Sequence, residues 1–169
     1  MTMKPLGLGV LGLGEGRSII SAGVHSKLWR VACLCDTNEA LAKERCAEFG
    51  VARYTTDYAV MLADPAVDVI GIYTPDHLHA DHAIRALEAG KHVICTKPFI
   101  DDLARARDIL SAQRRSGRQV MVGQSTRCFA PFTRQRQHYE SGALGDLVTV
   151  ETSYNADHRW FLEKPWAKQ

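Results

Sequence analysis

A glycine-rich turn near the start of the chain has the residue types and the spacing of a dinucleotide site. The segment Gly12-Leu13-Gly14-Glu15-Gly16-Arg17 follows an apolar run and precedes a helical pattern. Gly12 permits a tight turn, and Gly14 lets the backbone approach a pyrophosphate at the N-terminus of the next helix. Asp36 ends the next apolar run, roughly 20 residues further on, where a ribose-binding carboxylate is expected. The predicted dinucleotide contacts here are Gly12, Gly14, Gly16, Arg17 and Asp36.

The glycine pattern by itself leaves a second interpretation open. The literal pattern G-x-G-x-x-G occurs at Gly7, Gly9 and Gly12, but these residues lie inside the first predicted strand rather than after it. In the turn, the third glycine of the fingerprint falls on Arg17, with Gly16 one place early. Turns also use glycine for steric reasons alone, so a plain structural turn is the alternative. Asp36 at the expected distance favours the dinucleotide.

Two further polar segments follow predicted strands, at the edge where open α/β sheets bind ligands. They are Tyr73-Thr74-Pro75-Asp76-His77-Leu78-His79 and Cys95-Thr96-Lys97-Pro98-Phe99. Lys97 precedes a proline, which holds its backbone extended. A lysine beside a nicotinamide can donate a hydrogen bond to a substrate oxygen. The alternative is a solvated lysine before a turn.

An alternation of strands and helices must position these segments. The predicted strands are Leu6–Leu11, Trp29–Cys35, Val67–Tyr73, His92–Cys95 and Gln119–Val122. The predicted helices are Ser18–Ser26, Glu39–Phe49, Tyr58–Ala63, Ala80–Ala89 and Leu103–Ser116. The strand at Val67–Tyr73 is apolar almost throughout, which is typical of a parallel sheet buried on both faces. Short connections between strands and helices indicate right-handed crossovers and a doubly wound α/β sheet of the Rossmann type.

The alternation stops around Gly123–Cys128. A helix is predicted from Phe132 to Glu140, and Leu147–Ser153 reads as a strand. We therefore expect a dinucleotide-binding Rossmann domain over residues 1–124. Residues 125–169 are expected to begin a second, α+β domain for substrate binding and dimerisation, which this chain does not complete.

Composition narrows the function classes. The net charge of +2 gives no strong attraction to nucleic acid or to an acidic membrane, and no run is long enough to span a bilayer. The chain has five cysteines without C-x-x-C spacing, so a reducing cytoplasm is expected rather than a disulfide framework. The histidines around His79 lack three convergent ligands, and no metal site is predicted.

A longer run carries a family resemblance. Gly90-Lys91-His92-Val93-Ile94-Cys95-Thr96-Lys97-Pro98, with Thr74-Pro75 and His79 before it and Gly142-Ala143-Leu144-Gly145-Asp146 after it, resembles the glucose–fructose oxidoreductase / inositol dehydrogenase (Gfo/Idh/MocA) family. The similarity covers essentially the whole chain. It implies a Rossmann domain that binds NAD or NADP and a reaction that transfers hydride between a sugar or polyol and nicotinamide.

The resemblance also implies roles for residues. The family's lysine, in the motif Glu-Lys-Pro, maps onto Lys97 and serves catalysis and cofactor positioning, with a cis bond to Pro98. Its glutamate maps onto Thr96, so this chain departs there, although a hydroxyl can still bond a ribose. The implied cofactor contacts are the turn residues Gly12, Gly14, Gly16 and Arg17, with Asp36, Tyr73, Thr74, Pro75, His79, Thr96 and Lys97. Because Asp36 repels a 2′-phosphate and no arginine adjoins it in the sequence, NAD is expected over NADP.

The resulting expectation is an NAD(P)-dependent oxidoreductase acting on CH–OH groups of a sugar, inositol or related polyol, and a homo-oligomer when full length. The family's Asp/His acid–base pair is expected beyond Gln169, so we expect this chain by itself to bind NAD without efficient turnover. Two alternatives stay open at this point. One is an NAD-dependent glycosidase on the same scaffold, and the other is a regulator that binds dinucleotide without turnover.

Overall fold

The computed structural model describes residues 4–157 and 159–163 of the chain. Its contacts divide the chain into two compact units between Gly123 and Gln124. The remaining part of the expected second domain, residue 158 and residues 164–169, lies outside the described residues.

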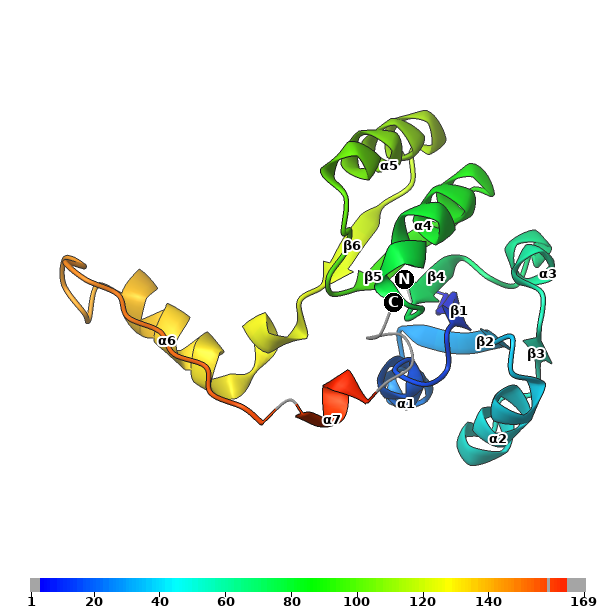
Figure 1. The fold of residues 1–169 in the computed structure, drawn as a ribbon, viewed down its shortest axis with the longest axis horizontal. Helices are drawn as coiled ribbons and strands as arrows, with labels where there is room; N and C mark the ends of the chain where they lie inside the picture. Colours follow the sequence, from blue (N-terminus) through cyan, green and yellow to red (C-terminus); the bar gives the residue numbers. More distant parts are fainter. Residues whose placement is uncertain (1–3, 158, 164–169) are drawn as a thin grey trace. The chain divides into compact units, whose positions relative to one another are not determined.

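The first unit is a six-stranded parallel sheet in the order β3-β2-β1-β4-β5-β6 (Figure 1). Its strands are β1 (Leu6–Leu11), β2 (Trp29–Cys35), β3 (Tyr54–Thr55), β4 (Val69–Ile72), β5 (His92–Thr96) and β6 (Val120–Gly123). The order changes direction between β1 and β4, because β2 follows β1 on one side and β4 lies on the other. The expected doubly wound parallel sheet is therefore confirmed, and its topological switch point lies between β1 and β4.

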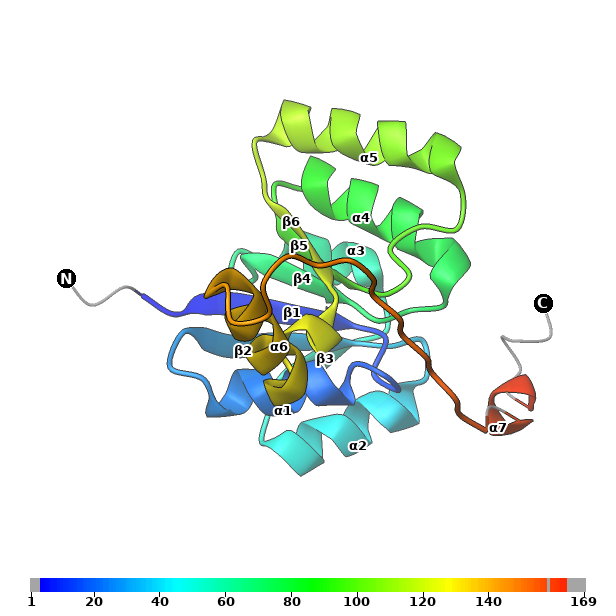
Figure 2. The ribbon, with the colours of Figure 1, turned by 90° about the vertical axis from the view of Figure 1, so that its left-hand side faces the viewer.

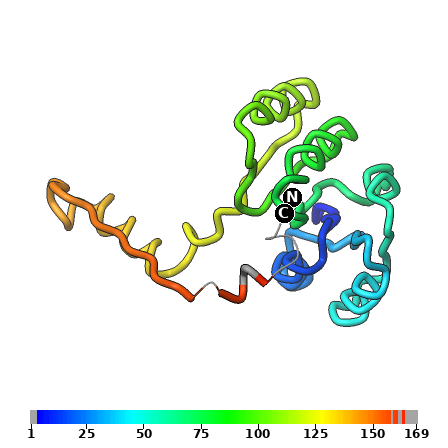
Figure 3. Tube along the Cα trace, in the orientation of Figure 1, coloured from blue at the N-terminus to red at the C-terminus, as the bar shows by residue number. Residues whose placement is uncertain are grey.

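Helices connect the strands and cover both faces of the sheet. They are α1 (Arg17–His25), α2 (Glu39–Phe49), α3 (Tyr58–Ala63), η1 (Asp76–Leu78), α4 (His79–Glu88) and α5 (Leu103–Ser116). Figure 2 shows α1 and α2 on one side of the strands and α4 and α5 on the other. The tube in Figure 3 follows this alternation along the chain. The bounds of α2, α3 and α5 match the sequence prediction.

The core consists of two clusters, one on each face of the sheet. The larger cluster packs side chains of α3, α4 and α5 against the strands, with Met61, Ile70 and Leu87 fully buried. The smaller cluster packs α1 and α2 against the opposite face, around Leu13 and Ile20. Both faces of the central strands are buried, which is why their sequences are apolar almost throughout.

Local hydrogen bonds set several helix ends. The carboxylate of Asp102 accepts a bond from the backbone N–H of Ala104 at 2.8 Å and so caps the start of α5. The helices α2 and α5 end at Gly50 and Gly117, both at a φ of 65°. Such left-handed ends favour glycine.

The structure corrects the predicted strand at Val67–Tyr73. The regular ladder of β4 runs only from Val69 to Ile72. Just before it, the backbone N–H of Asp68 donates to the carbonyl oxygen of Gly7 at 2.7 Å, whereas the N–H of Gly7 donates to the carboxylate of Asp68 at 2.7 Å. A side chain thus takes the place of a main-chain partner at the start of the strand. The two-residue β3 was not predicted, since it is too short to show a pattern.

The second unit contains η2 (Ser125–Cys128), α6 (Ala130–Glu140) and α7 (Arg159–Leu162). The predicted strand at Leu147–Ser153 is wrong: residues 147–153 form no strand in the described structure. Extended backbone needs a neighbouring strand to pair with, and the described part of this unit provides none. Apart from the half-buried Thr133, every residue from 124 to 157 is exposed.

Candidate dinucleotide site

The glycine turn lies between β1 and α1, at the switch point of the sheet. Gly12 has a φ of 85°, and a Cβ atom on it would lie 2.6 Å from the carbonyl oxygen of Tyr73 at the end of β4. A Cβ atom on Gly16 would lie 2.2 Å from the carbonyl oxygen of Gly12. The protein's own packing therefore requires glycine at both positions.

Gly14 differs from its two neighbours. A Cβ atom on Gly14 would meet nothing within 4 Å, and Gly14 and Glu15 are both exposed. The fold therefore gives no steric reason for glycine at this position. An outside group that approaches the backbone closely supplies such a reason, and a pyrophosphate at the N-terminus of α1 is a group of this kind.

The earlier glycines are explained by the sheet itself. Gly7 and Gly9 lie within β1, and a Cβ atom on Gly7 would lie 1.9 Å from the carbonyl oxygen of Ala66. A Cβ atom on Gly9 would lie 2.9 Å from Sδ of Met61. Their exclusion from the ligand turn is confirmed by their place inside the strand.

Asp36 follows β2, and its carboxylate is bonded to the same turn. Its Oδ2 accepts the backbone N–H of Leu13 at 2.8 Å, and its Oδ1 accepts that of Asn38 at 2.9 Å. Each carboxylate oxygen has further lone pairs, so Asp36 can still accept bonds from ribose hydroxyls. The carboxylate thus shapes the turn as well as presenting its charge there.

The guanidinium of Arg17 requires a correction, because it is committed within the protein. It pairs with Glu48 on α2 and lies over the ring of Phe49, 5.7 Å from the centroid. Glu48 also pairs with Arg45, whose Nε donates to the carbonyl oxygen of Leu13 at 3.4 Å. Two arginines from α1 and α2 therefore lie near the turn. The sequence around Asp36 did not indicate them, because neither arginine adjoins Asp36 in the chain. Both pair with Glu48, whose pKa they lower, and Arg45 pairs with Glu44 as well.

The segment after β4 is held by two histidines of α4. His79 is fully buried, with Nε2 2.7 Å from the carbonyl oxygen of Thr74 and Nδ1 2.7 Å from that of Pro98. Nδ1 of His82 lies 3.0 Å from Oγ1 of Thr74. Both nitrogens of the His79 ring therefore already face backbone carbonyls, and the predicted cofactor contact at His79 stays a prediction. The contact of His82 with Thr74 was not predicted, although the i, i+3 spacing from His79 was a usable signal.

The other predicted contacts divide between core and surface. The Tyr73 side chain packs against the cluster under α1 and α2, and burial raises its pKa, so only its backbone faces the turn at Gly12. Pro75 is exposed and precedes η1. Thr96 is half-buried at the end of β5, beside Gly123. Lys97 is exposed, and its bond to Pro98 is cis, as predicted.

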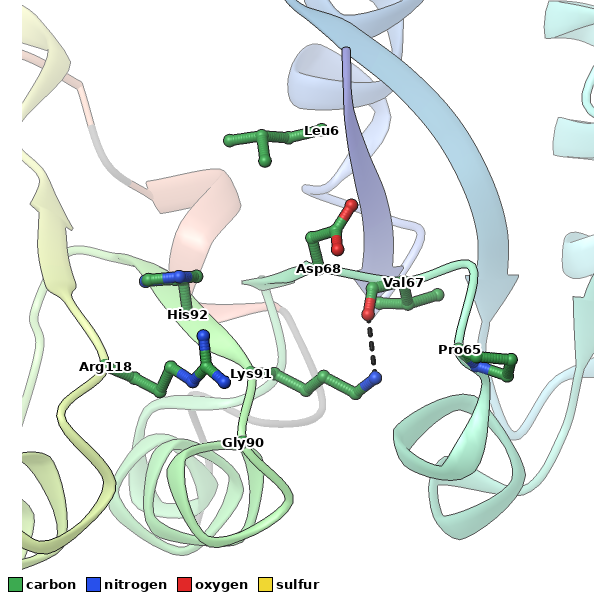
Figure 4. Close-up of a pocket in the computed structure, with 8 residues that line it drawn as sticks. All are labelled: Leu6, Pro65, Val67, Asp68, Gly90, Lys91, His92 and Arg118. Atoms are coloured by element: carbon green, nitrogen blue, oxygen red, sulfur yellow. Dashed lines mark hydrogen bonds between the residues drawn. The ribbon is translucent and has the colours of Figure 1, made fainter. Parts of the chain in front are cut away.

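A hollow of about 380 Å³ lies at the opposite edge of the sheet, where β1, β4 and β5 begin (Figure 4). Nζ of Lys91 donates to the carbonyl oxygens of Val67 at 2.7 Å and Asp64 at 2.8 Å. The carboxylate of Asp68 accepts the backbone N–H of Gly7. The polar groups of this hollow thus serve the fold, and parallel sheets bind ligands at the other edge.

The structure also bears on metals, disulfides and membranes. All five cysteines are free, and burial raises the pKa of Cys35 and of Cys95 to about 12. Within the part of the chain that the structure describes, no three His, Cys, Asp or Glu side chains gather as metal ligands. None of the helices in the described ranges is both long and apolar enough to cross a membrane.

Known proteins resemble this chain over most of its length. The sequence model of the GFO_IDH_MocA family, described as an oxidoreductase family with an NAD-binding Rossmann fold, matches residues 6–124. Levoglucosan dehydrogenase of Pseudarthrobacter phenanthrenivorans is 30% identical over 164 residues, which cover 92% of this chain and 42% of that protein. The scyllo-inositol 2-dehydrogenase (NAD(+)) of Bacillus subtilis is 26% identical over 85% of this chain and 41% of its own length.

Solved structures show the same relationship. A levoglucosan dehydrogenase in complex with NADH and levoglucosan superimposes with a TM-score of 0.74 at 30% identity, over 84% of this chain and 41% of that one. The WlbA dehydrogenase of Bordetella pertussis, in complex with NADH and UDP-GlcNAcA, gives a TM-score of 0.76 at 26% identity, over 86% of this chain and 42% of that one. The chain thus spans about two fifths of the length of the relatives that it matches.

The partly buried position of His82 predicts a pH effect on stability. Burial, with smaller contributions from Arg85 and His79, lowers the pKa of His82 from 6.5 to about 4. Between these values the unfolded chain binds more protons at this residue than the folded chain does, so stability falls as the pH falls from 6.5 towards 4. After allowance for solvent screening we expect His82 to account for roughly 1 kcal/mol of that loss.

This effect is measured by urea unfolding at pH 7 and pH 5. The variant His82→Gln is expected to lose less stability than the wild type between these two values, because the amide does not titrate. The control His25→Gln, at an exposed residue that ends α1, should keep the wild-type pH dependence. Equal pH dependence in the wild type and His82→Gln would contradict the assignment.

Proposed function

The chain belongs to the GFO_IDH_MocA family of oxidoreductases with an NAD-binding Rossmann fold, and we propose that its turn at Gly12–Gly16 binds the pyrophosphate of NAD for the oxidation of a sugar, inositol or related polyol. The observation that carries the proposal is the open face of Gly14. It lies between Gly12 and Gly16, which the fold itself requires to be glycine.

The residues of this chain fit the cofactor by their chemistry. The first backbone N–H groups of α1 are donors at a helix N-terminus, the usual partner of a phosphate. Arg17 contributes by its backbone, because Glu48 holds its guanidinium. The carboxylate of Asp36 accepts the ribose hydroxyls, and Thr96 offers a hydroxyl in place of the family's glutamate. The backbone of the segment Tyr73-Thr74-Pro75 lies beside the turn and forms one side of the proposed site.

The proposed chemistry is the oxidation of a CH–OH group. NAD, when bound, accepts a hydride from the substrate carbon. Lys97 donates a hydrogen bond from Nζ to the substrate oxygen and so favours the loss of its proton. We assign the partner acid or base to the part of the longer relatives that this chain does not cover.

The arrangement of the whole protein is proposed on the same basis. Residues 1–124 form the dinucleotide-binding domain, and residues 125–169 begin the substrate and dimerisation domain. The many exposed apolar side chains of the second unit, such as Phe129, Phe132 and Val148, support a partner surface there. We propose that the full-length protein is a cytoplasmic homo-oligomer that acts on small molecules and does not bind nucleic acid.

Calorimetric titration with NAD tests the role of Gly14. The variant Gly14→Ala is expected to keep the wild-type stability, since its methyl group meets nothing in the protein, and to raise the Kd for NAD at least about tenfold by blocking the close approach of the pyrophosphate. The control Gly50→Ala, at a φ of 65°, is expected to lose about 1 kcal/mol of stability and to keep its affinity for NAD. Unchanged NAD affinity in Gly14→Ala would overturn the proposed pyrophosphate position.

The charge of Asp36 predicts the preference between the two nicotinamide cofactors. The wild type is expected to bind NAD more tightly than NADP, because the carboxylate repels a 2′-phosphate. Asp36→Ala should narrow this gap by weakening NAD more than NADP. Asp36→Asn is the matched variant, since its amide oxygen can still accept the N–H of Leu13 that shapes the turn. Similar Kd values for the two cofactors in the wild type would contradict the prediction.

The role of Lys97 is tested by following NAD reduction with inositols, glucose and xylose. We expect turnover by the wild-type chain alone to lie below ordinary enzyme rates of about 1–10³ per second. Lys97→Met should lower the residual rate at saturating NAD about 100-fold. The control Lys91→Met, at the opposite edge of the sheet, should lower stability and leave the rate unchanged. An unchanged rate in Lys97→Met would remove the lysine from the reaction.

A further inference from the structure

The fully buried ring of His79 joins two loops that the proposed function places at the ligand edge. Its Nε2 lies 2.7 Å from the carbonyl oxygen of Thr74, in the loop after β4. Its Nδ1 lies 2.7 Å from the carbonyl oxygen of Pro98, in the loop after β5. No part of the residue is exposed, so water cannot replace either partner.

The two carbonyl partners determine which ring nitrogens must carry a hydrogen. A carbonyl oxygen only accepts hydrogen bonds, so each contact requires a hydrogen on the ring nitrogen. A neutral imidazole carries a hydrogen on one nitrogen only, and its other nitrogen would turn a lone pair towards a carbonyl oxygen. We propose that His79 is a positively charged imidazolium that cross-links the two loops and so positions Lys97, which precedes Pro98.

Opposing effects act on the charge of the ring. Full burial and the position of His79 as the first residue of α4 both disfavour a cation. The two carbonyl partners favour it, because hydrogen bonds from a charged donor are stronger than those from a neutral one. The carboxylates of Asp76 and Asp81 flank His79 in the sequence, although Asp81 also pairs with Arg105 of α5.

Other groups that can carry a positive charge lie near His79. His77 and Arg85 also lie on the segment of η1 and α4, and Lys97 lies on the loop that His79 holds. Burial is the main cause that lowers the pKa of His82. Both rings contact Thr74, His79 at its carbonyl oxygen and His82 at its Oγ1.

The cross-link acts on Lys97 through the backbone. Lys97 is exposed, and among the described residues its side chain has no ion pair. A long, flexible side chain is placed by its Cα position, and the Pro98 carbonyl directly follows that position in the chain. His79 is thus a positioning residue, and it touches neither substrate nor cofactor. This part of the inference rests on the proposed function of Lys97, whereas the charge of His79 does not.

Nitrogen-15 NMR of the histidine rings tests the charge without any ligand. At pH 8 we expect both nitrogens of His79 to give the signals of a protonated ring. His92 is the internal control, because its Nδ1 accepts the backbone N–H of Gln119 at 3.0 Å and its ring must be neutral. The pattern of a neutral tautomer at His79 would overturn the proposed charge, and this measurement does not depend on NAD binding.

A double-mutant cycle tests the link to Lys97. His79→Gln supplies only one donor group on its amide and is expected to lower the residual rate of NAD reduction at saturating NAD about tenfold, with His25→Gln as an exposed control that leaves this rate unchanged. In the Lys97→Met background the effect of His79→Gln should shrink, because the residue that it positions is gone. Full additivity of the two changes would overturn the positioning role. Failure of the wild type to bind NAD would overturn the proposed function instead, with the NMR result on His79 unaffected.

Discussion

The contact between Gly12 and the end of β4 is the constraint on which the rest of the first unit depends. A Cβ atom at Gly12 would lie 2.6 Å from the carbonyl oxygen of Tyr73, so any other residue would force β1 and β4 apart where the sheet reverses its order. The backbone N–H of Gly12 also donates to the carbonyl oxygen of Cys35 at 2.9 Å. One residue thereby joins the ends of three strands and directs the chain into α1.

Many polar groups around this edge are bonded to the protein's own backbone. His79 and His82 hold Thr74, Asp36 holds the N–H of Leu13, and Glu48 holds the arginines of α1 and α2. These bonds fix the loops before any ligand arrives, so less conformational entropy is lost on binding. Gly14 and Lys97 are among the residues that stay exposed at this edge.

The two units differ in how far the sequence could predict them. In the first unit, local sequence patterns placed α2, α3 and α5 at their observed bounds, because those signals act within one element. In the second unit, the β-branched run 147–153 suggested a strand that the described structure lacks. Strand formation needs a partner, and a local pattern carries no information about whether one is present.

The candidate site shows the same division. The sequence by itself determined the glycine turn, the carboxylate of Asp36 and the lysine before Pro98, because each depends on residue type and spacing along the chain. Only the tertiary structure decided that Arg17 pairs with Glu48 and that the ring of His79 faces two carbonyls. Glu48 lies 31 residues from Arg17, and the partners of His79 lie 5 and 19 residues from it. Hydrogen bonds depend on distance and direction in space, and only the folded chain sets these.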